Sequence, residues 1–184
     1  MASRDDYINQ VTLGERTPHN AGIHLAEYDA RWPALFNAEA EHLRAALGQK
    51  ALRIEHVGST AVPGLCAKPI IDMLLLVEDA ADELAYLRDM QAAGYVLRIR
   101  EPDWFGHRMF KGPQTDINLH VFSAGCPEVE RMLRFRNRLR AHPEDRARYA
   151  AAKRQLARRR WRYIQEYADA KTAVVQDILK RAGE

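Results

Sequence analysis

The sequence has few of the features that mark secreted, disulfide-bonded or membrane proteins. It contains only two cysteines, Cys66 and Cys126, and no Cys-x-x-Cys pair, so it offers neither a disulfide framework nor a zinc-ribbon pattern. Its first ten residues lack the apolar core of a signal peptide. The longest apolar run, residues 70–77, is far shorter than a membrane span and contains an aspartate. We therefore expect a reduced, cytoplasmic protein that does not enter a membrane.

Internal repeats, low-complexity segments and an obvious interdomain linker are also absent. The 184 residues are 47% hydrophobic and 29% charged, which is typical of one ordinary globular domain. The expected organisation is an N-terminal arm over residues 1–25 and one domain over residues 26–184. Within that domain, residues 131–184 are expected to be helical.

Positive charge is abundant but concentrated in one part of the chain. Residues 1–130 contain 12 Lys and Arg against 19 Asp and Glu, whereas residues 131–162 contain 13 against 2. Such a segment attracts phosphates or polyanions if its charges share a face. The alternative is a solvated helix surface paired with the acidic part of the same protein.

Hydrophobic periodicity predicts an α/β (α+β) domain in which a mixed sheet is flanked by helices and followed by a C-terminal helical pair. Residues 1–30 are expected to be irregular, with one short strand near 21–26. The strand over 70–77 is apolar on both faces and should lie inside the sheet, with Asp72 as its one polar member. Further strands are predicted over 52–57, 95–99, 107–111 and 116–122, and helices over 32–47, 59–63, 79–93, 127–140 and 143–181.

One segment, residues 56–72, combines the residue types that handle phosphate groups. A strand ends at Gly58-Ser59, a short helix follows, and Asp72 lies near the start of the next strand. Gly58 lets backbone N–H groups approach an anion closely, and the Ser59 hydroxyl can donate to phosphate oxygens. Asp72 can hold a divalent cation that bridges to the same phosphates.

The string His-Val-Gly-Ser-Thr-Ala-Val-Pro-Gly-Leu, followed by Lys-Pro-Ile-Ile-Asp, resembles the GrpB family of predicted nucleotidyltransferases, which belongs to the DNA polymerase beta superfamily. Residues 28–33 and 116–122 match the same family, so the resemblance runs from about residue 26 to the C-terminus. Domains of this family also occur fused to bacterial dephospho-CoA kinases. The resemblance implies a nucleotidyltransferase-type mixed sheet with a groove beside Gly58, Ser59 and Asp72.

The acidic residues depart from the superfamily pattern. Active members usually carry Asp-x-Asp or Asp-x-Glu on the second strand and a third acid on a later strand, whereas Leu74 stands two residues after Asp72 here. Two-metal catalysis needs several carboxylates around ions about 3.5–4 Å apart. Two arrangements stay open: one Mg²⁺ or Mn²⁺ held by Asp72, water and substrate phosphates, or a softer metal held by Asp72 with His120 or His56.

The candidate site therefore has a catalytic part and a phosphate-binding part. The catalytic residues would be Asp72, His120 and Asn118, with Asp72 and His120 as the metal ligands. The Tyr-x-x-x-Lys pair near the C-terminus resembles a feature of GrpB-like chains that could lean over the groove. The structural alternatives are a helix cap at Ser59, a core histidine at His120 and a docked helix face around the Tyr-x-x-x-Lys pair. The phosphate-binding residues would be Gly58, Ser59, Thr60, Lys68, Arg108, Tyr167 and Lys171.

Two hypotheses follow. The first is a metal-dependent nucleotidyltransferase that moves a nucleotidyl group from an NTP to an unknown acceptor, mostly by positioning and charge stabilisation. The second, favoured by Leu74, is a catalytically degenerate domain that binds a nucleotide or another phosphorylated small molecule. Only Trp161 and Tyr163 lie in the densest basic run, so a long nucleic acid is not the expected partner. Two helical stripes, Arg131/Arg134/Arg138 and Arg154/Arg158/Arg162, would either hold phosphates or be surface charges.

Overall fold

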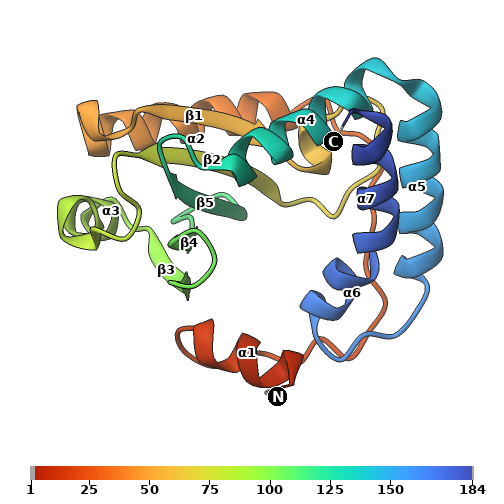
Figure 1. The fold of residues 1–184 in the computed structure, drawn as a ribbon, viewed down its shortest axis with the longest axis horizontal. Helices are drawn as coiled ribbons and strands as arrows, with labels where there is room; N and C mark the ends of the chain where they lie inside the picture. The colour runs from red at the N-terminus through yellow and green to blue at the C-terminus, as the bar shows by residue number, and fades with distance from the viewer. Residues whose placement is uncertain (1–2, 184) are drawn as a thin grey trace.

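The computed structural model describes residues 3–183, which contain a five-stranded mixed sheet flanked by helices (Figure 1). Its strands are β1 (Arg53–Val57), β2 (Ile71–Val77), β3 (Val96–Glu101), β4 (His107–Lys111) and β5 (Ile117–Ser123). They lie in the order β1-β2-β5-β4-β3; β2 and β5 are parallel, and the other neighbours are antiparallel. β2 therefore lies inside the sheet, as predicted, and the expected α/β fold class with a mixed sheet flanked by helices is confirmed.

Different helices cover the two faces of the sheet, as Figure 1 shows for α2 (Trp32–Leu47) and α4 (Pro127–Ala141). α2 packs with α3 (Leu87–Ala92) on the face that carries Met73 and Leu119, where the largest core cluster forms. α4 packs on the opposite face, over Leu74 and Phe122. Side chains alternate along a strand, so Asp72 and Asn118 share the face covered by α4, but they lie outside its apolar cluster. That polar end of the sheet is where the candidate site forms.

Most predicted elements are confirmed, and all five strands match to within two residues at each end. The helix predicted over 79–93 is shorter, because the Asp79 carboxylate accepts from the Ala81 N–H at 2.8 Å and fixes a turn before the 3₁₀ segment η3 (Glu83–Ala85) and α3. The short helix after Gly58 is the 3₁₀ segment η2 (Ser59–Ala61). Within residues 3–183, every helix is too short or too polar to cross a membrane.

The N-terminal arm is more ordered than the sequence predicted. Its residues 4–11 form α1 (Arg4–Val11), which is capped by the Ser3 hydroxyl at the Asp6 N–H, 3.1 Å away. The strand predicted near 21–26 is replaced by two isolated bridges, Ala21 with Trp161 and Ala26 with Ala67. The two bridges join the arm to the segment that follows α5 and to the segment that precedes β2.

The C-terminal helical pair is present as α4 and α5 (Pro143–Ala157), but the prediction of one helix over 143–181 is wrong. The chain leaves the helix after Ala157 because the arm satisfies its backbone: the Trp161 N–H donates to the Ala21 carbonyl, and the Trp161 indole donates to the last-turn Leu156 carbonyl at 2.9 Å. The Glu166 carboxylate then starts a new helix by accepting the Arg162 and Tyr163 N–H groups. The new helices are α6 (Ile164–Ala170) and α7 (Thr172–Arg181).

Candidate functional site

The site is organised around Asp72 at the start of β2. In the parallel β2–β5 register, Asp72 lies opposite Asn118, whose side-chain amide donates to Asp72 Oδ1 at 2.9 Å. Burial raises the pKa of the Asp72 carboxyl, whereas the Asn118 hydrogen bond and three nearby lysines oppose that rise. Asp72 and Asn118, predicted as catalytic residues, are therefore brought together.

Gly58 allows the turn after β1 to approach Asp72. Its φ of +69° is in the region that favours glycine. A Cβ placed on Gly58 would lie 2.8 Å from the Asp72 Cβ and closer still to the carboxylate, so no larger residue fits without a shift. The sequence identified this glycine correctly, although its closest neighbour is the Asp72 side chain.

Leu74 occupies the position where the superfamily pattern has a second acid. It faces the same side of the sheet as Asp72, it has no solvent-exposed surface, and it packs with Phe122 and the α4 residues Val129 and Leu133. The position is therefore part of the hydrophobic core under α4.

Thr60 has a structural role that the sequence did not separate from phosphate binding. Its hydroxyl lies 3.3 Å from the Ile70 carbonyl and 3.0 Å from His56 Nε2, which joins the Gly-Ser turn to the start of β2. His56 stacks on Phe36 with ring centroids 4.8 Å apart, and burial is the main cause that lowers its pKa to about 4. The Thr60 hydroxyl is thus occupied within the protein.

The C-terminal helices bring a buried lysine to the Gly-Ser turn. Lys153 of α5 is only 2% exposed; its Nζ donates to Ser59 Oγ at 2.8 Å and to the Cys66 carbonyl. Burial lowers the pKa of Lys153 to about 7. The sequence analysis did not select Lys153, because the angle at which α5 meets the sheet depends on a third core cluster formed by α4, α5, α7 and residues 62–66.

The predicted pair Tyr167 and Lys171 also reaches this site. Lys171 Nζ lies 4.6 Å from the centre of the Tyr167 ring, and burial lowers the pKa of Lys171 whereas the charge of Asp72 raises it. The Tyr167 hydroxyl is buried and has no hydrogen-bond partner among the described residues. A buried hydroxyl without a partner is costly, and a bound molecule could supply one.

Two further lysines influence Asp72 from the sheet. Lys68 precedes β2, and burial lowers its pKa, whereas the charges of Asp116 and Asp72 raise it. Lys111, at the end of β4, pairs with Asp116 at 2.9 Å. Lys68 was predicted, and Lys111 was missed although strand alternation places it on the same face as His120. The charges of four lysines therefore act on Asp72, and Asp116 is a second acid among them.

His120 is the end of a hydrogen-bonded chain that begins at α1. Tyr7 donates to Glu101 Oε1 at 2.7 Å, Glu101 Oε2 lies 2.7 Å from His107 Nδ1, and His107 Nε2 lies 3.0 Å from His120 Nδ1. Burial alone would raise the pKa of Glu101, but the bonds from His107 and Tyr7 lower it, so Glu101 accepts. Burial is the main cause that lowers the pKa of His120 to about 3.

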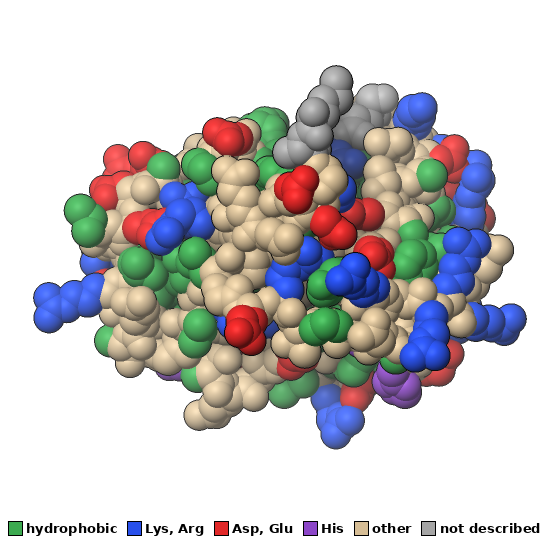
Figure 2. Space-filling model, turned by 90° about the horizontal axis from the view of Figure 1, so that it is seen from below, with side chains coloured by type: hydrophobic (Ala, Val, Ile, Leu, Met, Phe, Trp, Pro, Cys, Tyr) green, Lys and Arg blue, Asp and Glu red, His purple; other side chains and the backbone are tan. Residues whose placement is uncertain are grey.

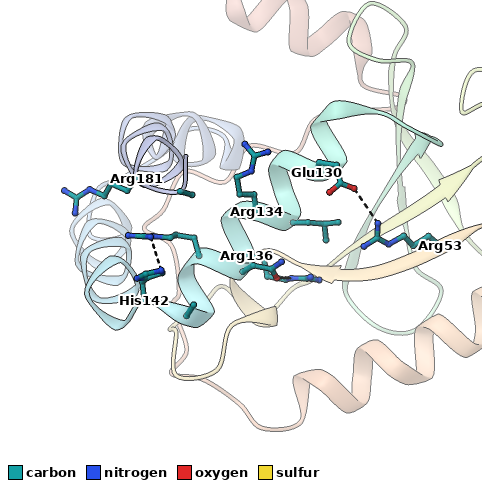
Figure 3. Close-up of a pocket in the computed structure, with 11 residues that line it drawn as sticks. Arg53, Glu130, Arg134, Arg136, His142 and Arg181 are labelled. Carbon is teal, nitrogen blue, oxygen red and sulfur yellow. Dashed lines mark hydrogen bonds and ion pairs between the residues drawn. The ribbon is translucent and has the colours of Figure 1, made fainter. Parts of the chain in front are cut away.

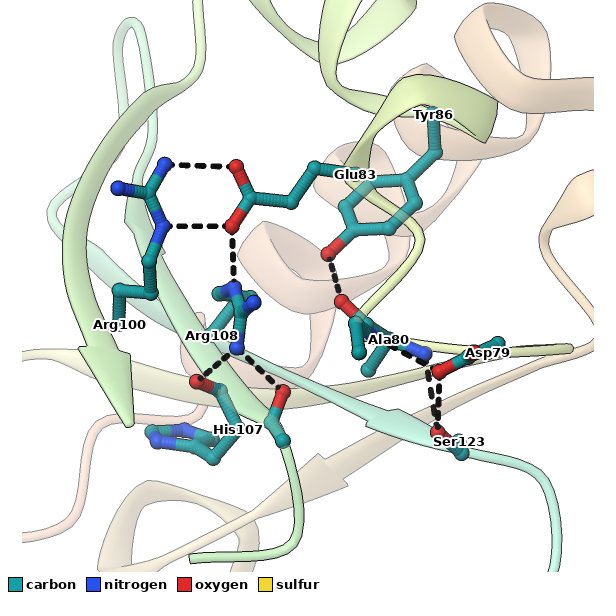
Figure 4. Close-up of polar contacts among 10 residues, drawn as sticks. Asp79, Ala80, Glu83, Tyr86, Arg100, His107, Arg108 and Ser123 are labelled. Carbon is teal, nitrogen blue, oxygen red and sulfur yellow. Dashed lines mark hydrogen bonds and ion pairs between the residues drawn. The ribbon is translucent and has the colours of Figure 1, made fainter. Parts of the chain in front are cut away.

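Arg108 is not part of this site, and the prediction that it binds phosphate there is wrong. It is paired with Val121 across β4 and β5, so it faces the side of the sheet opposite to Asp72. Its guanidinium donates to Glu83 at 2.5 Å and to the Gly106 carbonyl at 2.8 Å (Figure 4). The neighbouring His107 turns toward the site instead.

The described residues do not offer a two-metal centre. Nowhere in residues 3–183 do three or more His, Cys, Asp or Glu side chains cluster in a way that could hold a metal ion. Asp72 is bonded to Asn118 and surrounded by lysines, and Leu74 fills the second-acid position. The residues fit at most one ion, held by Asp72 together with oxygens of a bound molecule.

The arginine stripes are largely engaged within the protein. Arg138 pairs with Asp145 at 2.6 Å, and Arg154 pairs with Glu27 at 3.0 Å. The second stripe does not form, because α5 ends at Ala157 before Arg162. On the face seen in Figure 2, Lys and Arg side chains gather at the edge where α5 lies.

Comparisons with known proteins agree with this architecture. The family model described as GrpB protein matches residues 22–181. The UPF0157 protein BH1888 of Halalkalibacterium halodurans is 63% identical over 97% of this chain and 91% of its own length. A dephospho-CoA kinase of Mycolicibacterium paratuberculosis is 32% identical over 92% of this chain and 48% of its own length, which agrees with a domain that also occurs in a longer protein.

The solved structure of GrpB from Enterococcus faecalis superposes with a TM-score of 0.72 at 34% identity and covers 86% of this chain and 96% of that one. The resemblance carried by residues 56–72 is thus supported over almost the whole length. The chain belongs to the GrpB family.

Proposed function

We propose that the polar residues around Asp72 form a groove, called the Asp72 groove below, that binds a nucleotide or another phosphorylated small molecule through its phosphates. The observation that carries the proposal is the burial of Lys153 at the Gly-Ser turn, together with the partly buried Lys171, whose charge acts on Asp72. Burial lowers the pKa of both side chains, so each would gain from an anion. The unpartnered Tyr167 hydroxyl and the Ser59 hydroxyl offer further hydrogen bonds to phosphate oxygens.

In a two-metal site, carboxylates bind the metal ions that supply positive charge to the substrate. Here the lysine side chains would supply that charge. Lys68, Lys111, Lys153 and Lys171 come from four different segments and interact electrostatically with Asp72, while Asp116 pairs with Lys111. This balance suits a bound polyanion, because the excess charge is cationic before any metal is added. Where one Mg²⁺ or Mn²⁺ ion also binds, Asp72 would be its protein ligand, and the ion would neutralise phosphate charge.

The second candidate is transfer of a nucleotidyl group from an NTP to an unknown acceptor. The position of Asp72 beside Gly58 and Ser59 favours it, because that is where the superfamily places its first acid. His120 lies on the same face of the sheet as Asp72, where it would orient a bound group. This activity would depend on positioning and charge stabilisation by the lysines.

Binding is tested by the thermal shift of the full chain with each NTP, in EDTA and in Mg²⁺. We expect stabilisation that Lys171→Gln weakens, with about a tenfold loss of affinity because one hydrogen bond to a charged group is removed. The matched control is Lys180→Gln, an exposed lysine of α7, which should bind as the parent does. No shift with any nucleotide would overturn the proposal.

Transfer is tested separately with labelled NTP and cell extract. Labelling of an acceptor that requires Mg²⁺ and is lost in Asp72→Asn supports the transferase. Equal nucleotide stabilisation in EDTA and in Mg²⁺, with no labelled product, favours the binding domain.

A further inference from the structure

A second cationic pocket lies away from the Asp72 groove, between the start of β1, α4, the α4–α5 turn and the end of α7 (Figure 3). Its volume is about 480 Å³, which is in the range of small-molecule sites. Glu130 is the one carboxylate in its lining, and none of the four lysines of the groove contributes. The basic lining residues are Arg53, Arg134, Arg136, Arg138, His142 and Arg181.

Acidic side chains behind and beside the pocket hold several of these arginines in place. Asp145 is fully buried and is shared by Arg138, at 2.6 Å, and Arg181, at 3.4 Å. Glu55 is shared in the same way by Arg53 and Arg136, at 2.9 and 2.7 Å. Arg53 also pairs with Glu130 at 3.6 Å and Arg181 with Asp177 at 3.5 Å, so these four arginines are largely paired and the further positive charge of the pocket comes from Arg134. The guanidinium groups are also oriented before anything binds.

Arg134 lies in the same pocket without any such support. It is exposed, it projects from α4 between the other basic groups, and it has no ion-pair or hydrogen-bond partner among residues 3–183 (Figure 3). An unpaired guanidinium beside pre-oriented ones is a donor available to an anion. Planar guanidinium groups bind phosphate oxygens in pairs, which lysines cannot do.

We propose that this arginine pocket binds a small molecule that carries at least two phosphate groups. The limited volume of the pocket, about 480 Å³, favours a small molecule over a nucleic-acid strand, and the lining contains no aromatic side chain other than the His142 imidazole on which a base could stack. The site is independent of the Asp72 groove, so it would exist whether or not the groove binds nucleotides.

The test uses inorganic tripolyphosphate as the probe, with NMR titration of the full chain. We expect the backbone amides of residues 133–142 and 181–182 to shift. Arg134→Gln should weaken that binding about fivefold, a typical loss for one exposed charge-assisted contact. Arg88→Gln is the matched control, because Arg88 is an exposed arginine on α3 at the opposite end of the sheet (Figure 1). Lys171→Gln should leave the pocket titration unchanged.

Three outcomes would overturn the proposal. Equal weakening by Arg134→Gln and Arg88→Gln would show general charge attraction. Shifts confined to residues near the Gly-Ser turn, and sensitive only to Lys171→Gln, would show that the groove is the one phosphate site. Binding of oligouridylate that tightens with chain length, without a response to tripolyphosphate, would identify a nucleic-acid surface instead.

Discussion

The two cationic regions of this protein hold their charge by different means. In the Asp72 groove, Lys153 is buried and three partly buried lysines act on Asp72, and burial lowers the pKa of Lys68, Lys153 and Lys171. In the arginine pocket, guanidinium groups are paired with acids, of which Asp145 is fully buried. The protonation of the groove lysines should therefore depend on whether an anion is bound. The positive charge of the pocket arginines does not depend on a ligand, because they are held in ion pairs within the protein.

We therefore expect the ion pairs of the pocket to increase the free energy of unfolding. In the groove, we expect the close approach of Gly58 to Asp72 to restrict which residues fit, and Lys153 to make stability depend on pH. The largest expected effect is at Asp145, which is fully buried between Arg138 and Arg181. Asp145→Asn should lower the free energy of unfolding by about 3 kcal/mol, because it leaves two guanidinium groups without their acid. Urea denaturation measures this.

Glu144→Gln is the control for Asp145→Asn. Glu144 lies in the same first turn of α5 but is exposed, so the two variants change the helix-dipole interaction alike. Equal effects of the two changes would contradict the claim that the buried pairs stabilise the pocket.

The next effect tests the geometry of the groove. Gly58→Ala should destabilise the protein by about 3 kcal/mol, because the new Cβ overlaps Asp72 at a positive φ. Gly64→Ala is matched in backbone conformation, with φ +76°, but has no atom within 4 Å of the added Cβ, so it should cost about 1 kcal/mol. Similar losses of unfolding free energy in the two variants would show that the close approach to Asp72 is unimportant.

The smallest effect is a pH slope that comes from Lys153. Its pKa is about 7 in the folded protein and 10.5 when unperturbed, so between these values the unfolded chain holds a proton that the folded protein lacks. Stability should therefore rise with pH above about 7, by at most about 1.4 kcal/mol per pH unit for this group. Lys153→Met should flatten the rise measured by urea unfolding at pH 7, 8 and 9, and exposed Lys180→Met should not. Parallel slopes for Lys153→Met and the parent would refute the buried-lysine assignment.

Much of the fold could be predicted because local patterns and the sheet agree. The apolar run around Asp72 predicted an inner strand, and residues 116–122 predicted a later strand; the structure pairs the two in parallel and puts Asp72 and Asn118 on one face. The Gly-Ser motif then located the turn beside them. These features depend on strand periodicity and on the conformational freedom of glycine, and both can be predicted from a few neighbouring residues.

The remainder depends on long-range packing. The break after Ala157 follows from backbone bonds to the arm, more than a hundred residues earlier in the chain. The approach of Lys153 to Ser59 follows from how α5 docks, and the orientation of Arg108 depends on the register of β4. Charge alone could not decide these cases, since an arginine beside a predicted groove can equally be bonded to Glu83 on the other face.

The packing of Leu74 has a consequence for engineering. Replacing it with aspartate to complete the acidic pair would not create a metal ligand, because the new carboxylate would enter the dry layer between β2 and α4. A designer who wanted a two-metal enzyme would first have to move or shorten α4. The placement of α4, and not only the residue at position 74, therefore excludes a second metal-binding acid next to Asp72.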